Sequence, residues 1–465
     1  METRSTQAWA EETFGRAKLG DPRRTRRLVR MAAAAASRPG PTVTATQGSS
    51  AEREGAFRFL ENKAMDSAAV SKAIYESTGL ACSDEEAVFV AIDQMVHSVT
   101  DRRGIKGLGP SHNRQSTKSK TIHWMNSLVV DSKGTPMGLI DQQVWVRGED
   151  FKPHIHDDER PADERESWKW VEALQASESQ FQEAMAGCRR WYVMDRGADC
   201  HAVWSLVAER KLAVTIRSCY ERVIRRNGRE QRLNTTLARQ RVLDSFELLV
   251  SGNEHRKARV ANFEVRVLRV PVRLRSSKYG KELWIDATAV EVRENGTTPP
   301  GEDPILWRLL STVQAESKAD VLRIIESYTL RWRVEEFHKT WKSGACDVEN
   351  VQLRSFEAIY RWATLLAAVA VRVERLKRLS RKHPELDALE ELSREEIDAA
   401  IILTKTKKYE VGAYLTLEEA VRLIAIVGGH MGSPSYGPPG TTTIRRGLDH
   451  VVPAAIALAR VGTSD

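Results

Sequence analysis

Two short apolar runs that each end in an aspartate constrain the fold of this chain more than any other feature of its sequence. AVFVAID ends at Asp93 and RRWYVMD ends at Asp195, and both have the length and composition of single strands. Carboxylates just past apolar strands have little water around them and repel one another unless a cation joins them. Mg²⁺ prefers such hard oxygen ligands and also accepts phosphate oxygens. Taken singly, each aspartate could be a strand-end or capping residue, and Asp195 could form a local ion-pair knot with Arg196 and Asp199.

The segments around these runs predict a mixed α/β pattern of strands and helices. TIHWMNSLVVD (121–131) and PMGLIDQQVWVR (136–147) have the pattern of two paired strands separated by the turn SKG. An amphipathic helix follows around residues 164–174. A helix after Asp199 and the strand KLAVTIR (211–217) complete a three-layer α/β pattern.

The pattern changes along the chain, which at 465 residues is too long for one compact core. Residues 1–75 predict a small helical domain, and residues 76–350 predict the α/β domain. This domain is interrupted at about 218–300, where alternating runs such as FEVRVLRVPVRLR predict antiparallel strands with outward arginines. Residues 351–465 are mainly helical. We therefore predict an α/β domain with a β-rich insertion, flanked by two helical domains.

The first helical domain carries a basic helix that suits binding to DNA. Asp21 can cap a helix that has Pro22 at its first position. Ser49 and Glu52 have the spacing of a capping box at the start of a second helix. The basic side chains on the first helix are Arg23, Arg24, Arg26, Arg27 and Arg30. A purely structural helical cap is the alternative.

Arginine recurs in the segments 216–232 and 255–278, and the formal net charge is +8. Arginine donates a planar fork of hydrogen bonds that suits phosphate oxygens and base edges. A single cluster could be a solvated face, but three clusters in one chain favour a nucleic-acid partner.

A helix predicted from about 319 to 344 has apolar side chains on one side and mainly charged side chains on the other. At about 100° per residue, one apolar stripe should face the core and consists of Leu330, Val334, Phe337 and Trp341. Five other side chains lie within roughly 60° of one another on the opposite side, namely Tyr328, Arg331, Glu335, Lys339 and Lys342. Glu336 points about 100° away from Glu335. One acid among cations suggests a metal-binding carboxylate flanked by phosphate contacts, and an i,i+4 salt-bridge ladder is the alternative.

These segments resemble one family in order along nearly the whole chain. YTLRWRVEEFHKTWKSGA (328–345) is similar to the signature helix of the DDE transposases of the insertion-sequence-four group, of the transposon-five type. DRGADCHAVW (195–204) resembles the second acidic motif of that family, and AVFVAIDQM resembles the first. LGDPRRTRRLV (19–29) and EREGAFRFLEN (52–62) resemble its amino-terminal DNA-binding domain, and LWRLLST (306–312) resembles the segment before the signature helix.

The resemblance implies an RNase H-like, retroviral-integrase-like catalytic core with a β-rich insertion and a carboxy-terminal dimerisation region. It assigns a metal-binding catalytic triad to Asp93, Asp195 and Glu335. It also implies DNA contacts at Tyr328, Arg331, Lys342, Arg217 and, more weakly, Lys339. Trp307 would accept a base flipped out near the transposon end, with a plain core aromatic as the alternative.

The implied function is cut-and-paste DNA transposition, in which transposon ends are bound, nicked, closed into hairpins, excised and joined to target DNA. Two Mg²⁺ ions per active site, for which Mn²⁺ can substitute, would support in-line phosphoryl transfer. The partners would be double-stranded DNA, as transposon ends and as target, and a second copy of the chain in a synaptic complex. The rivals are a catalytically silent end-binding protein or repressor, and a nuclease that cuts without joining.

Two departures from the family and three general features complete the prediction. Gln94 and Met95 follow the first acid where relatives often carry hydroxyl residues, and about 60 carboxy-terminal residues match only loosely. No apolar run approaches the roughly 20 residues that span a bilayer. METRSTQAWAEE lacks the layout of a secretory signal. The five cysteines form no C-x-x-C pair. We expect a cytoplasmic, nucleoid-associated bacterial protein with no membrane partner, zinc site or disulfide framework.

Overall fold

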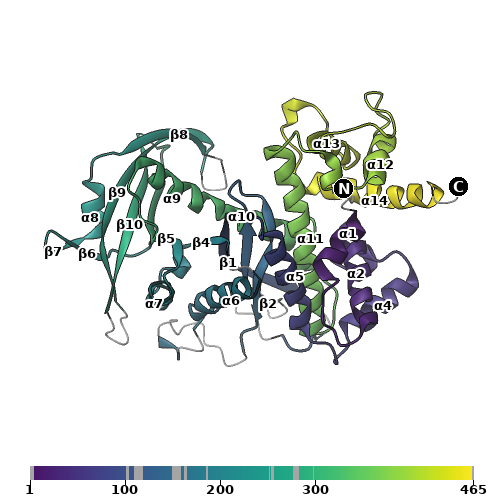
Figure 1. Ribbon diagram of the computed structural model, residues 1–465, viewed down its shortest axis with the longest axis horizontal. Coiled ribbons are helices and arrows are strands. Elements are labelled where there is room, and N and C mark those ends of the chain that lie inside the picture. Colours follow the sequence, from purple (N-terminus) through teal and green to yellow (C-terminus); the bar gives the residue numbers. More distant parts are fainter. Residues whose placement is uncertain are drawn as a thin grey trace.

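A single mixed sheet runs through the part of the chain that the structure describes. The computed structural model describes residues 5–100, 104–108, 119–148, 159–161, 165–184, 187–250, 252, 256–275, 282–296 and 298–462. Within them the strand order is β3-β2-β1-β4-β5-β11-β10-β9-β6-β7, and β8 pairs with β9. Figure 1 shows this sheet extending from the middle of the molecule to one end, with both helical ends of the chain at the other.

The central sheet contains the strands predicted from the sequence, and their directions are mixed. They are β1 (Ala87–Thr100), β2 (Ser119–Val130), β3 (Pro136–Trp145), β4 (Arg189–Met194) and β5 (Ala213–Arg217). β2 pairs antiparallel with both β1 and β3, whereas β4 runs parallel to both β1 and β5. The helices α6 (Trp168–Ala184) and α7 (His201–Arg210) pack against each other, and α6 lies over β2 and β3.

Asp93 does not end its strand, so the prediction of a strand terminus there is wrong. The parallel pairing of β1 with β4 stops at Ile92, opposite Met194. The antiparallel pairing of β1 with β2 continues, with Asp93 opposite Asn126, as far as Thr100. The local sequence does not reveal this continuation, because hydrogen bonds from a neighbouring strand keep the backbone extended after the apolar run ends.

The segment between β5 and β11 (Leu306–Ser311) extends the same sheet. Its elements are β6 (Val223–Arg226), β7 (Arg229–Arg232), α8 (Leu233–Ala238), β8 (Asp244–Val250), β9 (Arg259–Arg275) and β10 (Glu282–Asn295). The strands β9 and β10 pair antiparallel over nearly their whole length, and β10 also pairs with β11. Because β5 and β11 are themselves hydrogen-bonded neighbours, everything between them is inserted at one point of the sheet.

The predicted helix 319–344 is two helices, and the prediction of one continuous helix is wrong. α9 (Lys318–Leu330) ends and α10 (Trp332–Lys342) begins at Arg331. As predicted, Val334, Phe337 and Trp341 are fully buried. α9 lies over β4 and β5, whereas α10 lies over β1 and β2. The break allows one amphipathic segment to follow two parts of a twisted sheet.

The amino-terminal residues form five helices before the sheet begins. They are α1 (Thr6–Phe14), α2 (Pro22–Ser37), α3 (Val43–Thr46), α4 (Ser50–Leu60) and α5 (Ser67–Ala81). Both predicted starts are confirmed, since the Asp21 side chain caps α2 and Ser49 with Glu52 forms a capping box on α4.

The helix α11 (Phe356–Lys382) joins the three parts of the molecule. It contacts α2, α4 and α5 on the amino-terminal side, β3 and α10 in the centre, and α13 and α14 on the carboxy-terminal side. Figure 1 shows it as a long rod between the sheet and both helical ends of the chain. Most of its side chains are buried, as expected for a helix that is covered on several sides.

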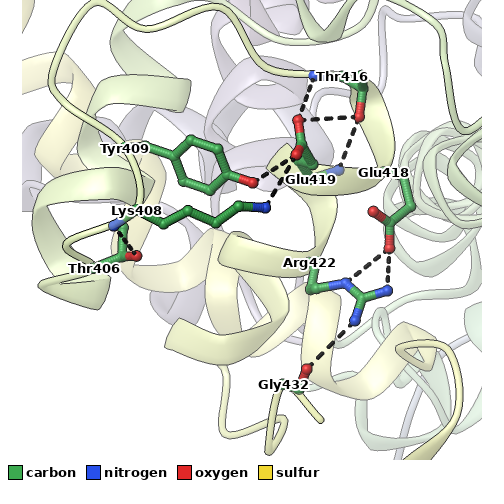
Figure 2. A network of polar contacts seen from close by, with 8 residues as sticks. All are labelled: Thr406, Lys408, Tyr409, Thr416, Glu418, Glu419, Arg422 and Gly432. Atoms are coloured by element: carbon green, nitrogen blue, oxygen red, sulfur yellow. Dashed lines mark hydrogen bonds and ion pairs between the residues drawn. The ribbon is translucent and has the colours of Figure 1, made fainter. Parts of the chain in front are cut away.

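The carboxy-terminal helices pack around a core of their own, which Leu376 and Leu379 of α11 complete. The helices are α12 (Arg394–Thr404), α13 (Leu417–Val427) and α14 (Thr441–Gly462). Figure 2 shows the polar network at the start of α13. There Glu419 accepts hydrogen bonds from Tyr409, Lys408 and the Thr416 backbone, which closes a capping box.

Removing the charge of Glu419 is expected to loosen α13 at neutral pH but not in acid. The hydrogen bond from Tyr409, followed by those from Thr416 and Lys408, lowers the pKa of Glu419 below its usual 4.5. A lowered carboxylate pKa stabilises the fold above the unfolded value, and this stabilisation is lost as pH falls through the folded value. In Glu419→Gln, amide exchange of α13 should be about fivefold faster at pH 7, which corresponds to about 1 kcal/mol for a cap.

The Glu419→Gln difference should shrink once the pH falls below 4.5 and the wild-type carboxylate becomes protonated. Glu418→Gln is the matched control, because Glu418 only pairs with Arg422 one turn along the same helix and should change exchange little. A Glu419 effect that is independent of pH would contradict this role of its charge.

Candidate active site

Asp93 lies in a confined acidic environment at the point where β4 ends beside β1. Its side chain is 14% exposed, and one of its oxygens accepts a hydrogen bond from the Gln94 backbone N–H at 2.9 Å. Burial raises the pKa of Asp93, Arg331 lowers it, and the neighbouring Asp195 and Glu335 carboxylates raise it, with a net value of about 7. The fold therefore brings together the three acids that the sequence analysis singled out.

Arg331 lies between two of these acids. Its guanidinium donates one hydrogen bond to Asp93 Oδ2 at 3.1 Å and another to Glu335 Oε1 at 2.6 Å. The side chain is buried and lies where α9 ends and α10 begins. The helix geometry placed it opposite the core-facing stripe, in one strip with Glu335. The i,i+4 ion pair of Arg331 with Glu335 does exist, but the same guanidinium also binds Asp93 in the sheet.

Asp195 and Asp199 have separate environments, which rules out the local knot with Arg196. Asp195 caps a short 3₁₀ turn (Arg196–Ala198) by accepting a hydrogen bond from the Gly197 N–H at 2.7 Å. Asp199 is buried and pairs with Arg222. It also accepts hydrogen bonds from Trp204 at 2.9 Å and from the Cys219 N–H at 3.0 Å. Asp199 thus anchors the chain after β5, whereas Asp195 faces the site.

The residue types at this site fit a divalent cation. Three carboxylates supply hard oxygen ligands, and their mutual repulsion raises the cost of the charged state until a cation offsets it. In the described residues these side chains do not close into a three-ligand metal cluster. The positive charge near Asp93 and Glu335 is here the guanidinium of Arg331.

Tyr328 and Trp307 form an aromatic pair close to the acids. Their rings meet edge to face with centroids 5.8 Å apart. Tyr328 is only 2% exposed, and burial raises its pKa while Arg331 and Arg217 lower it. Trp307 is half-buried, so it has a packed side and an accessible side. Arg217 is half-buried and donates to the Leu306 carbonyl oxygen at 3.2 Å.

The two lysines of the predicted strip lie on α10 beyond Glu335. Lys339 is exposed. Lys342 is 36% exposed and pairs with Glu349 at 3.4 Å. Glu336 points elsewhere, as the helix geometry predicted, and pairs with Arg333 and Lys377.

The arginines of α2 divide into two groups. Arg24 donates to the Leu19 carbonyl oxygen at 3.0 Å, and Arg27 packs so closely on α4 that a Cβ at Gly55 would lie 2.7 Å from its Cζ. These two therefore have structural contacts within the helical domain. Arg23, Arg26 and Arg30 are exposed, and Arg23 also pairs with Asp21.

Sequence reasoning missed a set of buried polar residues behind the acids. Asn126 and His338 share a hydrogen bond of 3.0 Å, and Asn126 lies directly opposite Asp93. The one available signal was a polar asparagine in the middle of the apolar run TIHWMNSLVV.

Three family models match successive parts of the chain. A transposase DNA-binding model matches residues 6–65, a transposase DDE domain model matches residues 154–372, and a transposase Tn5 dimerisation domain model matches residues 368–463. Asp195 and Glu335 fall within the DDE match, and Asp93 precedes it.

The RNase H-like sheet and its acidic site define a polynucleotidyl transferase that acts on DNA. The chain belongs to the DDE transposases of the Tn5 type. It is thus a DNA transposase with a helical DNA-binding region, an α/β catalytic core and a helical dimerisation region, and its partners are DNA and a second copy of itself. No helix in the described residues is long and apolar enough to cross a membrane.

Proposed function

We propose that Asp93, Asp195 and Glu335 hold two Mg²⁺ ions and that this site performs cut-and-paste transposition of DNA. The observation that carries the proposal is the bridging of Asp93 and Glu335 by Arg331, with Asp195 near enough to raise the pKa of Asp93. Family members generally use a divalent metal, and Mn²⁺ should substitute for Mg²⁺ because both accept oxygen ligands. The domain boundaries proposed are 1–75, 76–350 and 351–465, and the compartment proposed is the bacterial cytoplasm, at the nucleoid.

The bound cations would supply activation of the attacking oxygen and stabilisation of the leaving oxygen in each phosphoryl transfer. The three carboxylates would orient those cations. Arg331 sits where it can exchange its carboxylate partners for a phosphate, because a guanidinium forks equally well onto either. Lys339 and Lys342 line the next turn of α10 and can hold the DNA backbone on the same side.

The aromatic pair of Tyr328 and Trp307 suits a step in which one base leaves the stack of bases in the DNA double helix. Unstacking a base costs a few kcal/mol, and an aromatic surface can offset part of that cost. Trp307 has an accessible side, and Tyr328 fixes its other side edge to face. We propose that the water-nicked strand attacks its complement to form a hairpin while Trp307 holds the displaced base. Opening the hairpin and joining to target DNA would reuse the site.

The decisive experiment follows excision and joining on a supercoiled plasmid that carries the terminal repeats of the element. Wild type with Mg²⁺ or Mn²⁺ should release the segment through a hairpin and insert it elsewhere. Glu335→Gln should bind the ends and leave them uncut. Glu336→Gln is the matched control, because this neighbouring acid pairs with Arg333 and Lys377 and not with Arg331.

The same assay separates the rival functions. A catalytically silent end-binding protein or repressor would bind the repeats and give no cut product with either metal, which would overturn the proposal. A nuclease would give cut ends and no joined product. If Glu336→Gln lost cutting as fully as Glu335→Gln, the assignment of the third acid to Glu335 would be wrong.

A further inference from the structure

A chain of four buried polar side chains runs beneath the acidic site and joins four elements. The hydroxyl of Thr364 in α11 donates to Gln142 Oε1 in β3 at 2.8 Å, and Gln142 Nε2 donates to Asn126 Oδ1 in β2 at 2.8 Å. The amide of Asn126 then meets His338 Nε2 in α10 at 3.0 Å. None of the four is more than 8% exposed, so the chain is shielded from water along its length.

The direction of these hydrogen bonds fixes the state of the histidine. Each amide donates onward, so Nε2 of His338 accepts and the ring proton is on Nδ1. Burial lowers the pKa of His338 to about 3, and the nearby Arg331 and Lys342 lower it as well. The imidazole is therefore a neutral acceptor, and its contact with Asn126 persists across the working pH range.

Asn126 and His338, the last two members of this hydrogen-bonded chain, lie next to the acids without touching them. Asn126 is the cross-strand partner of Asp93, and His338 follows Glu335 by three residues, one turn further along α10. Trp341 and Thr340 of α10 make their polar contacts on the side away from the sheet, since Trp341 donates to the Ala363 carbonyl oxygen of α11 and Thr340 donates to Glu374. The bond from His338 to Asn126 joins α10 to the strand beside Asp93.

The hydrogen bond between His338 and Asn126 can resist sliding of α10 along the sheet, which the surrounding apolar contacts resist only weakly. Apolar packing resists separation of α10 from the sheet, but it is not directional and resists sliding weakly. A buried hydrogen bond has a narrow range of favourable distances and angles, and losing it leaves a desolvated donor in Asn126. This hydrogen bond thus sets the position of α10 along β1 and β2, and with it the position of Glu335 relative to Asp93.

We propose that His338 is a positioning residue that, through Asn126, Gln142 and Thr364, holds Glu335 at the separation from Asp93 that a shared divalent cation requires. This inference rests on the proposed metal site. His338 contacts neither substrate nor cation, so its loss should change the affinity for metal before it changes the binding of DNA.

The test compares His338→Leu, which removes the acceptor, with His338→Gln, which keeps an acceptor at a similar reach. Mn²⁺ is titrated against the full chain, and the rise in melting temperature is followed without DNA. Outer-shell partners of metal ligands typically contribute 10–100-fold in affinity, so the half-saturating Mn²⁺ concentration should rise about tenfold or more in His338→Leu. Glutamine should restore it to within about threefold. His383→Leu, at the far end of α11, is the control, and end binding without metal should be equal in all variants.

Unchanged Mn²⁺ affinity in His338→Leu would overturn the proposal, as would a glutamine variant no better than leucine. If His338→Leu does not fold, Thr364→Val tests the other end of the chain with nearly the same volume, and it should weaken Mn²⁺ binding in the same direction. An unaltered Mn²⁺ titration in a folded Thr364→Val would likewise overturn it. Wild type that binds Mn²⁺ but never cuts DNA would contradict the proposed function alone.

Discussion

Replacing Asp93 by Asn is expected to abolish DNA cutting while leaving the metal-free protein at least as resistant to heat as wild type. The loss should be about 10³-fold or more, as for removal of other groups that act together at a reacting centre. The gain in stability follows from the cost of keeping Asp93 charged. Its pKa is raised to about 7, first by burial and then by Asp195 and Glu335.

The sign of the pH dependence follows from that pKa. A carboxyl whose folded pKa lies above its unfolded value of about 3.8 binds more protons when folded. It therefore destabilises the fold progressively as pH rises from about 4 to about 7. Asparagine carries no charge and can still accept the hydrogen bond from Arg331. The melting temperature of Asp93→Asn should exceed that of wild type above pH 7, by about 2–4 °C for each kcal/mol gained. The difference should vanish near pH 4.

Calorimetry without metal and the plasmid assay with metal measure the two halves of this prediction. Asp141→Asn is the matched control, because Asp141 is another buried acid in the sheet whose pKa burial raises to about 7. It should also gain stability, yet it should keep its cutting activity. If Asp93→Asn melted well below wild type at pH 8, the charged Asp93 would be stabilising the fold through Arg331, and the destabilisation assigned to its charge would be wrong.

Replacing Arg361 by Ala is expected to detach the amino-terminal helices from the rest of the molecule. This buried arginine of α11 donates to the carbonyl oxygens of Leu60 at 2.7 Å, Asn62 at 3.1 Å and Met65 at 2.8 Å. It also donates to the Ser67 hydroxyl at 2.9 Å. The four acceptors lie between the last residue of α4 and the first residue of α5. Truncation leaves them without their charged donor, which costs about 1–3 kcal/mol for each buried acceptor that stays unsatisfied.

The Arg361→Ala variant should be cleaved by protease between α4 and α5 far faster than wild type, and it should bind transposon ends weakly. The weak binding follows because α2 would no longer be held in place relative to the catalytic core. Arg361→Lys keeps the charge but cannot reach four acceptors in a fork, so it should fall between the two. Arg354→Ala, an exposed position just before α11, is the control. Equal protease resistance in Arg361→Ala and wild type would show that apolar packing alone holds the helices in place.

The sequence predicted two of the amino-terminal helices, α2 and α4, and the strands of the central sheet. The starts of α2 and α4 were predictable because Asp21, Ser49 and Glu52 bond to backbone groups within three residues. The buried stripe of α10 was predictable from the spacing of Val334 and Phe337 alone. The three acids could be singled out because their family motifs are short and continuous, and their roles as metal ligands remain a prediction.

The tertiary structure alone decided how those acids are placed. Asp93 lies in mid-strand because β2 continues beside it, and Arg331, at the junction of α9 and α10, bridges Asp93 and Glu335. The contact between Arg331 and Asp93 joins residues 238 positions apart. The hydrogen-bonded chain from His338 to Thr364 crosses four elements. Helix caps and apolar periodicity are set by residues within one or two turns, so the sequence by itself determines them. The approach of distant polar groups depends on how the sheet twists and how each helix packs on it, and this emerges only once the whole core has formed.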